Sequence, residues 1–187
     1  MDSITESQLI MRSQEGDEAA VADLVEKHAQ AIFRLALSVL DDPEEAEEAA
    51  QEAWINALNH LDRFRGEASF RTWLFAITLN TCRSRLRKRD RLRRIEEVLT
   101  SIFHLRKSDR SHPEEAFLEK ERGDQVSEAI RSLRENERLA ILLRYYHELP
   151  IAQIAQIMQV SERTVYVRLR DAHIHLKTVL GSGEDKR

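Results

Sequence analysis

The sequence contains few of the residues on which disulfide frameworks, metal sites and tight turns depend. Of its 187 residues, one is cysteine, three are proline and five are glycine. A single cysteine, Cys82, excludes an internal disulfide and cannot by itself supply a zinc site. The Glu-x-x-His motif, the Gly-rich phosphate loop and the nucleophile elbow are also missing. We therefore expect no enzyme, no cofactor, no bound metal and no small-molecule substrate.

Long hydrophobic runs are missing as well. No apolar stretch approaches the roughly eighteen residues that a membrane helix requires. The first residues, MDSITESQLIMRSQEGDE, are polar and acidic, whereas a signal peptide begins with a basic and then an apolar segment. The sequence thus predicts a cytoplasmic protein that is neither exported nor inserted into a membrane.

What the sequence has in abundance favours helices. Hydrophobic residues make up 42% and charged residues 33% of the chain, and Glu, Arg, Leu and Ala are frequent. These residues have high helix propensity, and the hydrophobic fraction suffices for real cores. We predict an all-α fold with two small helical domains joined by a flexible linker. The predicted boundaries are residues 1–94 for the first domain, 95–112 for the linker and 113–187 for the second domain.

The net charge of −4 conceals two dense blocks of opposite sign. Residues 41–52 contain seven acids and no base, and residues 83–94 contain eight bases and one acid, Asp90. Such a basic block indicates a polyanion contact, although it could also be a solvated tail. Because the chain is acidic overall, we expect it to bind DNA weakly on its own.

Periodic patterns locate the helices of the first region. A helix is predicted over residues 17–40, and a second one begins at Asp42-Pro43, where a capping residue precedes a proline at the first position. After a loop at residues 63–67, Ser69 is expected to cap a long helix. Its core-facing residues should be Phe70, Trp73, Leu74 and Ile77. Beyond the linker we predict a helix interrupted near Gly123 and another over residues 139–146.

The segment 149–180 predicts a helix-turn-helix. Apolar residues at three- and four-residue spacing define one buried face before the turn at residues 159–161, and Ser161 is a good cap for the following helix. That second helix presents basic and polar side chains, a geometry that suits a DNA major groove. A helical hairpin with a merely solvated basic face is the alternative reading.

Four segments in the same order resemble the bacterial sigma factors of the extracytoplasmic-function (ECF) group, which direct RNA polymerase to promoters. The acidic helix AEEAAQEAWINAL, residues 46–58, resembles the family's polymerase-binding helix. The segment FRGEASFRTWLFAITLNTCRSRLR, residues 64–87, resembles the minus-10 element, and residues 133–176 resemble the minus-35 domain. The resemblance implies an alternative sigma factor that reads both promoter elements and helps to melt DNA.

The resemblance also assigns residues to each role. Core polymerase, through its largest and second-largest subunits, would be bound by Glu48, Ala49, Gln51, Glu52, Trp54, Ile55 and Leu58. The minus-10 DNA would be bound by Phe64, Arg65, Ser69, Phe70, Asn80, Arg83 and Arg87. The minus-35 DNA would be bound by Arg163, Thr164, Tyr166, Val167, Arg168 and Arg170. Family members are commonly held by an anti-sigma factor, so we expect such a partner as well.

Three departures from the family pattern concern its functional segments. Gln159 stands where the family usually has glycine in the turn, which implies some strain if its backbone is left-handed. Asp171 and His173 stand where a basic tract commonly ends the recognition helix, so phosphate contacts there are weakened. Ala49 and Ala50 replace bulkier residues of the polymerase-binding helix.

Two other functions fit parts of the sequence. A stand-alone helix-turn-helix regulator would bind DNA through residues 149–180 and use the first region for dimerisation or effector binding. A pure protein-interaction module would leave the basic segments without a polyanion partner. Purified core polymerase distinguishes the three, because only a sigma factor should form a stable complex with it.

Overall fold

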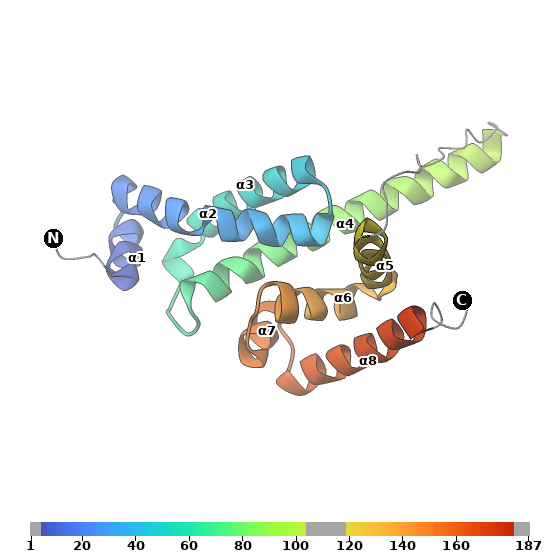
Figure 1. The fold of residues 1–187 in the computed structure, drawn as a ribbon. Coiled ribbons are helices and arrows are strands. Elements are labelled where there is room, and N and C mark those ends of the chain that lie inside the picture. Colours follow the sequence, from blue (N-terminus) through green and yellow to red (C-terminus); the bar gives the residue numbers. More distant parts are fainter. Residues whose placement is uncertain (1–4, 104–118, 182–187) are drawn as a thin grey trace. The chain divides into compact units, whose positions relative to one another are not determined.

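The computed structural model describes residues 5–103 and 119–181, and within them every regular element is a helix, as predicted (Figure 1). The chain divides into two compact units. The first comprises residues 1–88 and 152–160, and the second comprises residues 89–151 and 161–187. Each unit is described by itself. None of the described helices combines the length and the apolar composition that a membrane span requires.

Five helical elements form the main part of the first unit. They are α1 (Glu6–Gln14), α2 (Glu18–Leu40), α3 (Pro43–Asn59), the short 3₁₀ helix η1 (Leu61–Arg63) and α4, which starts in this unit and spans Phe70–Phe103. The caps predicted at residues 42 and 69 are confirmed, and a further cap, which was not predicted, lies at the start of α2. Asp17 accepts hydrogen bonds at the start of α2, Asp42 accepts one from Glu45 N at 2.9 Å, and Ser69 accepts one from Thr72 N at 3.1 Å.

The core of this unit lies along α2. Leu24, Ile32 and Leu35 of α2 are fully buried, as are Phe75 and Leu79 of α4. The buried face of α3 is made of alanines, which are Ala46, Ala49, Ala50, Ala53 and Ala57. Side chains this small let a helix backbone approach its neighbour closely, and α3 packs against α2. The opposite face of α3 is left for other contacts.

The length of α4 differs from the prediction. We expected a linker without regular structure from residue 95, but α4 continues to Phe103. The helix persists because residues 70–103 contain neither glycine nor proline and are rich in residues of high helix propensity. The predicted linker residues 104–112 lie outside the described part of the chain.

The second unit contains α5 (Glu119–Ser132), α6 (Glu135–Ile141), the π-helical turn η2 (Leu142–Tyr146) and α8 (Glu162–Gly181). Both α5 and α6 pack against α8, and Leu139, Leu143, Val165 and Ala172 are completely buried. Two predictions for this region were wrong. The helix α5 passes through Gly123 without interruption, since a single helical glycine costs only about 1 kcal/mol, and α6 begins at Glu135 instead of residue 139.

The turn before α8 has the predicted form. The helix α7 (Ile151–Met158) ends at Gln159, whose φ of 55° lies in the left-handed region, and Val160 N donates to Ala155 O at 3.0 Å. A left-handed backbone at a residue other than glycine costs roughly 1 kcal/mol. Ser161 Oγ then accepts a hydrogen bond from Thr164 N at 3.2 Å and caps α8.

Candidate functional site

One face of α3 is exposed and carries both charge and apolar surface. Glu48, Gln51, Glu52 and Ile55 recur at helical spacing and are all exposed, and 60% of the Ile55 surface is accessible. Leu58 extends the same face by one turn. An exposed isoleucine and leucine beside carboxylates are a surface that suits a protein partner.

Two residues assigned to this face lie elsewhere. Ala49 is completely buried between the helices of its own unit, so it does not itself lie on the exposed face. Trp54 is half-buried, and its indole nitrogen has no hydrogen-bond partner in the described part of the chain. Both belong to the face of α3 that helical spacing turns towards the core or its edge.

Arg85 joins the acidic helix to the basic block. Its Nη1 donates to Glu48 Oε2 at 2.8 Å, and its Nε and Nη2 donate to Glu52 Oε2 at 3.1 and 2.9 Å. The hydrogen bond to Glu48, with that to Glu52, raises the pKa of Arg85. At least one guanidinium of the basic block therefore serves to orient α3, and is not available to a phosphate.

Three aromatic rings surround the loop of residues 64–69, which joins η1 to α4. Phe64 lies 5.3 Å from both Phe70 and Trp73, measured between ring centroids, and Phe70 lies 5.6 Å from Trp73. Phe70 is only 2% exposed, whereas Phe64 and Trp73 are half-buried. Phe70 thus packs beneath the loop and supports it, and its side chain is not on the accessible surface. Trp73, expected in the core, lies at its edge.

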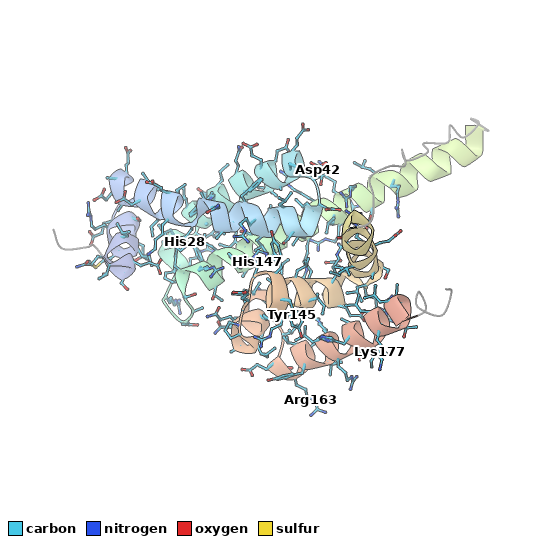
Figure 2. All side chains as sticks on the ribbon, viewed as in Figure 1. His28, Asp42, Tyr145, His147, Arg163 and Lys177 are labelled. Atoms are coloured by element: carbon cyan, nitrogen blue, oxygen red, sulfur yellow. The ribbon has the colours of Figure 1, made fainter. Side chains whose placement is uncertain are left out.

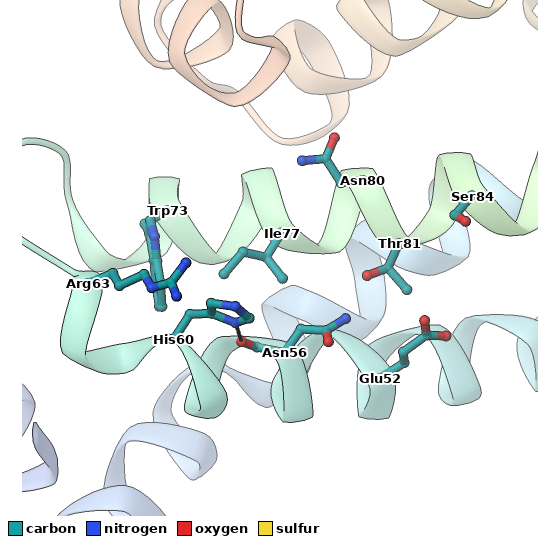
Figure 3. A pocket seen from close by; sticks show the side chains of 9 residues that line it. All are labelled: Glu52, Asn56, His60, Arg63, Trp73, Ile77, Asn80, Thr81 and Ser84. Carbon is teal, nitrogen blue, oxygen red and sulfur yellow. Dashed lines mark hydrogen bonds between the residues drawn. The ribbon is translucent and has the colours of Figure 1, made fainter.

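A cavity of about 450 Å³ opens beside this aromatic cluster, between α3, η1 and α4 (Figure 3). Trp73 and Ile77 of α4 form its apolar wall, and Asn56 and His60 face them from α3. Asn80 lies at its rim and projects from α4 on the side away from α3. The cavity thus combines an aromatic ring with several hydrogen-bonding groups.

The remaining residues assigned to the minus-10 DNA are mostly accessible. Arg65, Ser69, Asn80 and Arg87 are exposed, and Arg83 is half-buried. Ser69 Oγ also lies 2.8 Å from Thr72 Oγ1, so this hydroxyl acts in the cap of α4. Arg65 and Ser69 lie in the loop before α4, whereas Asn80 and Arg87 lie progressively farther along this helix.

The start of α8 presents an exposed face made of Arg163, Tyr166, Val167 and Arg170. Tyr166 is 60% and Val167 38% exposed, so neither packs into the core. Figure 2 shows Arg163 projecting outward from the first turn of α8. Thr164, one of the assigned residues, has its hydroxyl 2.8 Å from Ser161 Oγ, and Arg168 is half-buried at the side of this face.

Asp171 pairs with the last arginine of this face. Arg170 Nε and Nη2 donate to Asp171 Oδ1 at 3.0 and 2.8 Å. The two following histidines, which lie two positions apart on the helix, have different neighbours: His173 Nε2 lies 3.1 Å from Tyr145 Oη, and His175 Nε2 lies 3.2 Å from Ser132 Oγ. No group of three potential metal ligands occurs among the described residues.

Cys82 is buried in α4, and burial raises the pKa of its thiol to about 12. A thiol with so high a pKa is protonated near neutral pH and is chemically inert. Cys82 is therefore a packing residue of the first unit.

Sequence reasoning missed several contacts that shape these surfaces. His28 is buried in α2 and bonds to Glu6, and its register with Leu24, Ile32 and Leu35 could have revealed its burial. The contact of Gln14 with residues 61 and 64 carries no local signal, because the partners are about fifty residues apart in sequence.

Comparisons with known proteins show sequence matches over both parts of the chain. Residues 24–92 match sigma-70 region 2, and residues 123–176 match sigma-70 region 4. The chain is 34% identical over 169 residues to the RNA polymerase sigma-H factor of Pseudomonas aeruginosa, covering 88% of each chain. It is 31% identical over 166 residues to the ECF RNA polymerase sigma factor SigW of Bacillus subtilis, covering 86% of this chain and 88% of SigW.

Solved structures share the fold. CnrH, in complex with the cytosolic domain of CnrY, superposes with a TM-score of 0.65 at 21% identity, covering 93% of this chain and 96% of CnrH. The sigma factor RpoE of Bartonella quintana, in complex with the anti-sigma factor NepR, gives a TM-score of 0.62 at 24% identity, covering 86% of this chain and 96% of RpoE.

The matches to sigma-70 region 2 and sigma-70 region 4 define a bacterial transcription initiation factor. The chain belongs to the RNA polymerase sigma factors and, within them, to the ECF group of alternative sigma factors. The resemblance stated from the sequence is thereby confirmed.

Proposed function

We propose that this sigma factor binds core RNA polymerase through α3, reads and melts the minus-10 element with its first domain, and reads the minus-35 element with α8. One observation carries the proposal: most of the assigned side chains of α3 and α8 lie on exposed faces, while the opposite faces are buried, through alanines in α3 and through Val165, Leu169 and Ala172 in α8. We keep residues 1–94 and 113–187 as the proposed domains. Transcription would place the chain in the cytoplasm.

Polymerase binding is assigned to Glu48, Gln51, Glu52, Ile55 and Leu58. The carboxylates would meet a basic surface on the clamp of the largest subunit, and the two apolar side chains would become buried. Such burial contributes about 25 cal/mol per Å² of apolar surface. Arg85 fixes the two carboxylates before binding, which lowers the entropy that association costs.

Strand capture is assigned to the 64–69 loop and the neighbouring cavity. A volume of about 450 Å³ is within the usual range of small-ligand pockets, and Trp73 offers an aromatic ring to an unstacked base. Phe64, Arg65 and Asn80 would contact the extruded base or the strand beside it, and Arg83 and Arg87 would hold phosphates. Binding the unpaired strand offsets the cost of opening the duplex.

Minus-35 reading is assigned to the exposed face of α8. Tyr166, Val167 and Arg170 would meet base edges, and Val167 could contact a thymine methyl group. Arg163, Thr164 and Arg168 would hold phosphates and fix the register of the helix. Asp171 lowers the positive charge at the end of this face.

An anti-sigma factor is the proposed regulator. Both solved structures are complexes. RpoE is bound to the anti-sigma factor NepR, and CnrH is bound to the cytosolic domain of CnrY. In the present chain, Ile174, Val179 and Leu180 of α8 are exposed apolar residues that such a partner could cover.

Purified core polymerase tests the proposal. The chain should form a stable complex with the core on gel filtration, and the complex should initiate transcription from specific promoters of the source genome. A chain that bound promoter DNA tightly without the core would instead be a stand-alone regulator, and a chain that bound neither would be an interaction module.

A further inference from the structure

The first helix is linked to both ends of the 64–69 loop, directly at the start and through His28 at the end, although it lies outside the family match. The match to region 2 begins at residue 24, whereas α1 spans Glu6–Gln14. Its last residue, Gln14, bonds to the backbone that enters the loop. Its first residue, Glu6, bonds to His28, which packs against the Phe70 ring after the loop. These two contacts link α1 to the proposed strand-capturing segment.

The first contact is made by the side-chain amide of Gln14. Its Nε2 donates to Leu61 O at 2.9 Å and to Phe64 O at 3.1 Å. An amide nitrogen has two hydrogens, so both can be engaged at once. Phe64 N donates to Leu61 O at 3.1 Å within the same turn. Gln14 thus fixes the two carbonyls that set the direction of the chain as it leaves η1.

The second contact runs through a buried histidine. His28 Nε2 lies 3.0 Å from Glu6 Oε1, and Lys27 Nζ lies 2.9 Å from the same oxygen. The His28 ring meets the Phe70 ring edge-on, with 5.4 Å between centroids. Phe70 in turn supports Phe64. The start of α1 therefore helps to fix Phe70, the residue that directly follows the loop.

The helix α1 is itself held in place along its length. Thr5 and Gln8 form a capping box at its start, Leu9 is buried, and Arg12 Nη2 pairs with Asp17 Oδ2 at 2.6 Å. A helix of nine residues does not persist alone in water, so these contacts keep it folded. Its position is thus set by the same contacts that reach the loop.

We propose that α1 is a positioning element for the 64–69 loop, with Gln14 as its positioning residue. The inference rests on the proposed strand capture. By fixing Leu61 O and Phe64 O, Gln14 keeps the loop in the geometry that accepts an unpaired base, so the loop does not have to be ordered when the strand binds. Loss of this contact lowers affinity for the unpaired strand.

Because Gln14 lies at the surface, its role in ordering the loop can be tested separately from any role in holding the domain together. Gln14 is exposed, and its bond to Phe64 O lies at the surface. When the amide is removed, water can replace it at Phe64 O, and only the partly buried bond to Leu61 O is lost, so the domain stays folded. The order of the loop changes, while the core of the domain does not.

Strand binding by the holoenzyme tests the proposal. The probe is a fluorescent single-stranded oligonucleotide that carries the non-template strand of a promoter from which the wild-type holoenzyme initiates. Gln14→Ala should bind it about five- to tenfold more weakly, the loss expected for two surface hydrogen bonds. Met11→Ala, an exposed residue of the same helix, should bind as the wild type does.

A donor-retaining variant gives the decisive comparison. Gln14→Lys keeps hydrogen-bond donors that reach the same carbonyls, so it should recover most of the affinity. Hydrogen exchange should be faster at the amides of residues 61–69 in Gln14→Ala and near the wild-type rate in Gln14→Lys. Core affinity and the melting temperature should stay unchanged in both. If Gln14→Ala does not fold, Gln14→Glu, which keeps the volume but loses the donor, takes its place.

Three outcomes would overturn the proposal. Equal strand affinity of Gln14→Ala and the wild type would remove Gln14 from the loop's function, and failure of Gln14→Lys to recover binding would reject hydrogen bonding as the cause. Unchanged exchange at residues 61–69 would show that α1 does not order the loop. Failure of the wild-type holoenzyme itself to bind the strand would overturn strand capture instead, and the exchange rates would still decide whether α1 positions the loop.

Discussion

Arg85 donates two hydrogen bonds to a single carboxylate oxygen of Glu52, from Nε at 3.1 Å and from Nη2 at 2.9 Å. The pair joins α3 to α4 and unites two segments whose opposite charges look independent in the sequence. It is accessible to solvent, so its contribution to stability is small, about 0.2–1 kcal/mol. Its main consequence is to fix a carboxylate of the proposed polymerase-binding face.

Polymerase binding should depend on the exposed face of α3 and not on the ion pair itself. Gln51→Ala combined with Glu52→Lys should weaken association with core polymerase, because it removes an exposed contact and reverses a charge. Helical content should be retained, since neither side chain is in the core. The measurement is competition for core polymerase, with circular dichroism as the check on folding.

Arg85→Ala is the matched control for this change. It breaks the same ion pair but leaves the side chains of α3 intact, so core affinity should fall far less than with the double substitution. Unchanged affinity of the double variant would remove α3 from the polymerase interface. An equal loss in Arg85→Ala would mean that orientation of the carboxylates dominates.

Local signals in the sequence predicted the starts of α2, α3, α4 and α8, whereas contacts distant in sequence gave no signal. Caps such as Asp42 and Ser161 act within three residues, so their chemistry is visible in the sequence. The bonds of Arg85 to Glu52 and of Gln14 to Leu61 depend on how helices pack, which no short pattern encodes.

Burial within a helix was predicted less well than helix position. Ala49 and Phe70 were assigned to partners because the resemblance places them in functional segments, yet both are buried. Alanines at helical spacing on α3 are compatible with two interpretations, which are close packing against a neighbouring helix and a smaller contact surface for polymerase. The end of α4 was missed because a charged segment without apolar periodicity can still be helical when it lacks glycine and proline.

Two arginines of α8 should affect promoter binding differently, because one is assigned to a base edge and the other to a phosphate. Arg170→Ala should cost about 1–3 kcal/mol and relax the preference at one upstream base, because a guanidinium commonly reads a base edge. Arg168→Ala should weaken binding to all sequences similarly and lower the salt slope by about 1. Binding of the holoenzyme to promoter variants at several salt concentrations measures both effects.

Asp171→Asn is a further test of this face. Asp171 holds the Arg170 guanidinium, so removal of its charge should raise affinity for all sequences and reduce selectivity. The reverse pattern for the two arginines, with Arg168 selective and Arg170 uniform, would show that the recognition helix is rotated relative to this assignment.

The stability of the first unit should fall as the pH drops below 6.5. Burial lowers the pKa of His28 from its usual value of 6.5; the hydrogen bond with the Glu6 carboxylate opposes this shift, and the charges of Lys27 and Arg71 add to it. A lowered histidine pKa means that the folded state binds protons less readily than the unfolded state. The stability from neutral His28 is therefore complete above pH 6.5 and is lost as pH falls towards the folded-state pKa.

Urea unfolding followed by tryptophan fluorescence measures this dependence, since both tryptophans, Trp54 and Trp73, lie in the first unit. The free energy of unfolding should be lower at pH 5.5 than at pH 8, and His28→Gln should reduce the difference. Glu6 does not confound this window. Burial raises its pKa, but the hydrogen bonds with Lys27 and His28 outweigh that effect and lower it below 4.5. An identical pH dependence in the wild type and His28→Gln would contradict the assignment.

Promoter melting should depend on Asn80, which lies at the rim of the cavity beside the aromatic cluster. Its side chain is exposed, whereas the neighbouring Leu79 is fully buried, so Asn80→Ala should leave the fold and polymerase binding near normal. The defect should appear on duplex promoters, where contacts with the unpaired strand must offset an opening cost of a few kcal/mol. Asn59→Ala removes the same side chain from the exposed end of α3, outside the cavity, and should have little effect.

A template whose minus-10 region is already mismatched decides what Asn80 does. On such a template the opening cost is absent, so Asn80→Ala should recover much of its activity in transcription assays. If the variant were equally defective on duplex and pre-melted templates, the loss could not arise from strand capture during opening. Asn80 would then act in binding or folding, and the cavity between α3 and α4 would have to be reassigned.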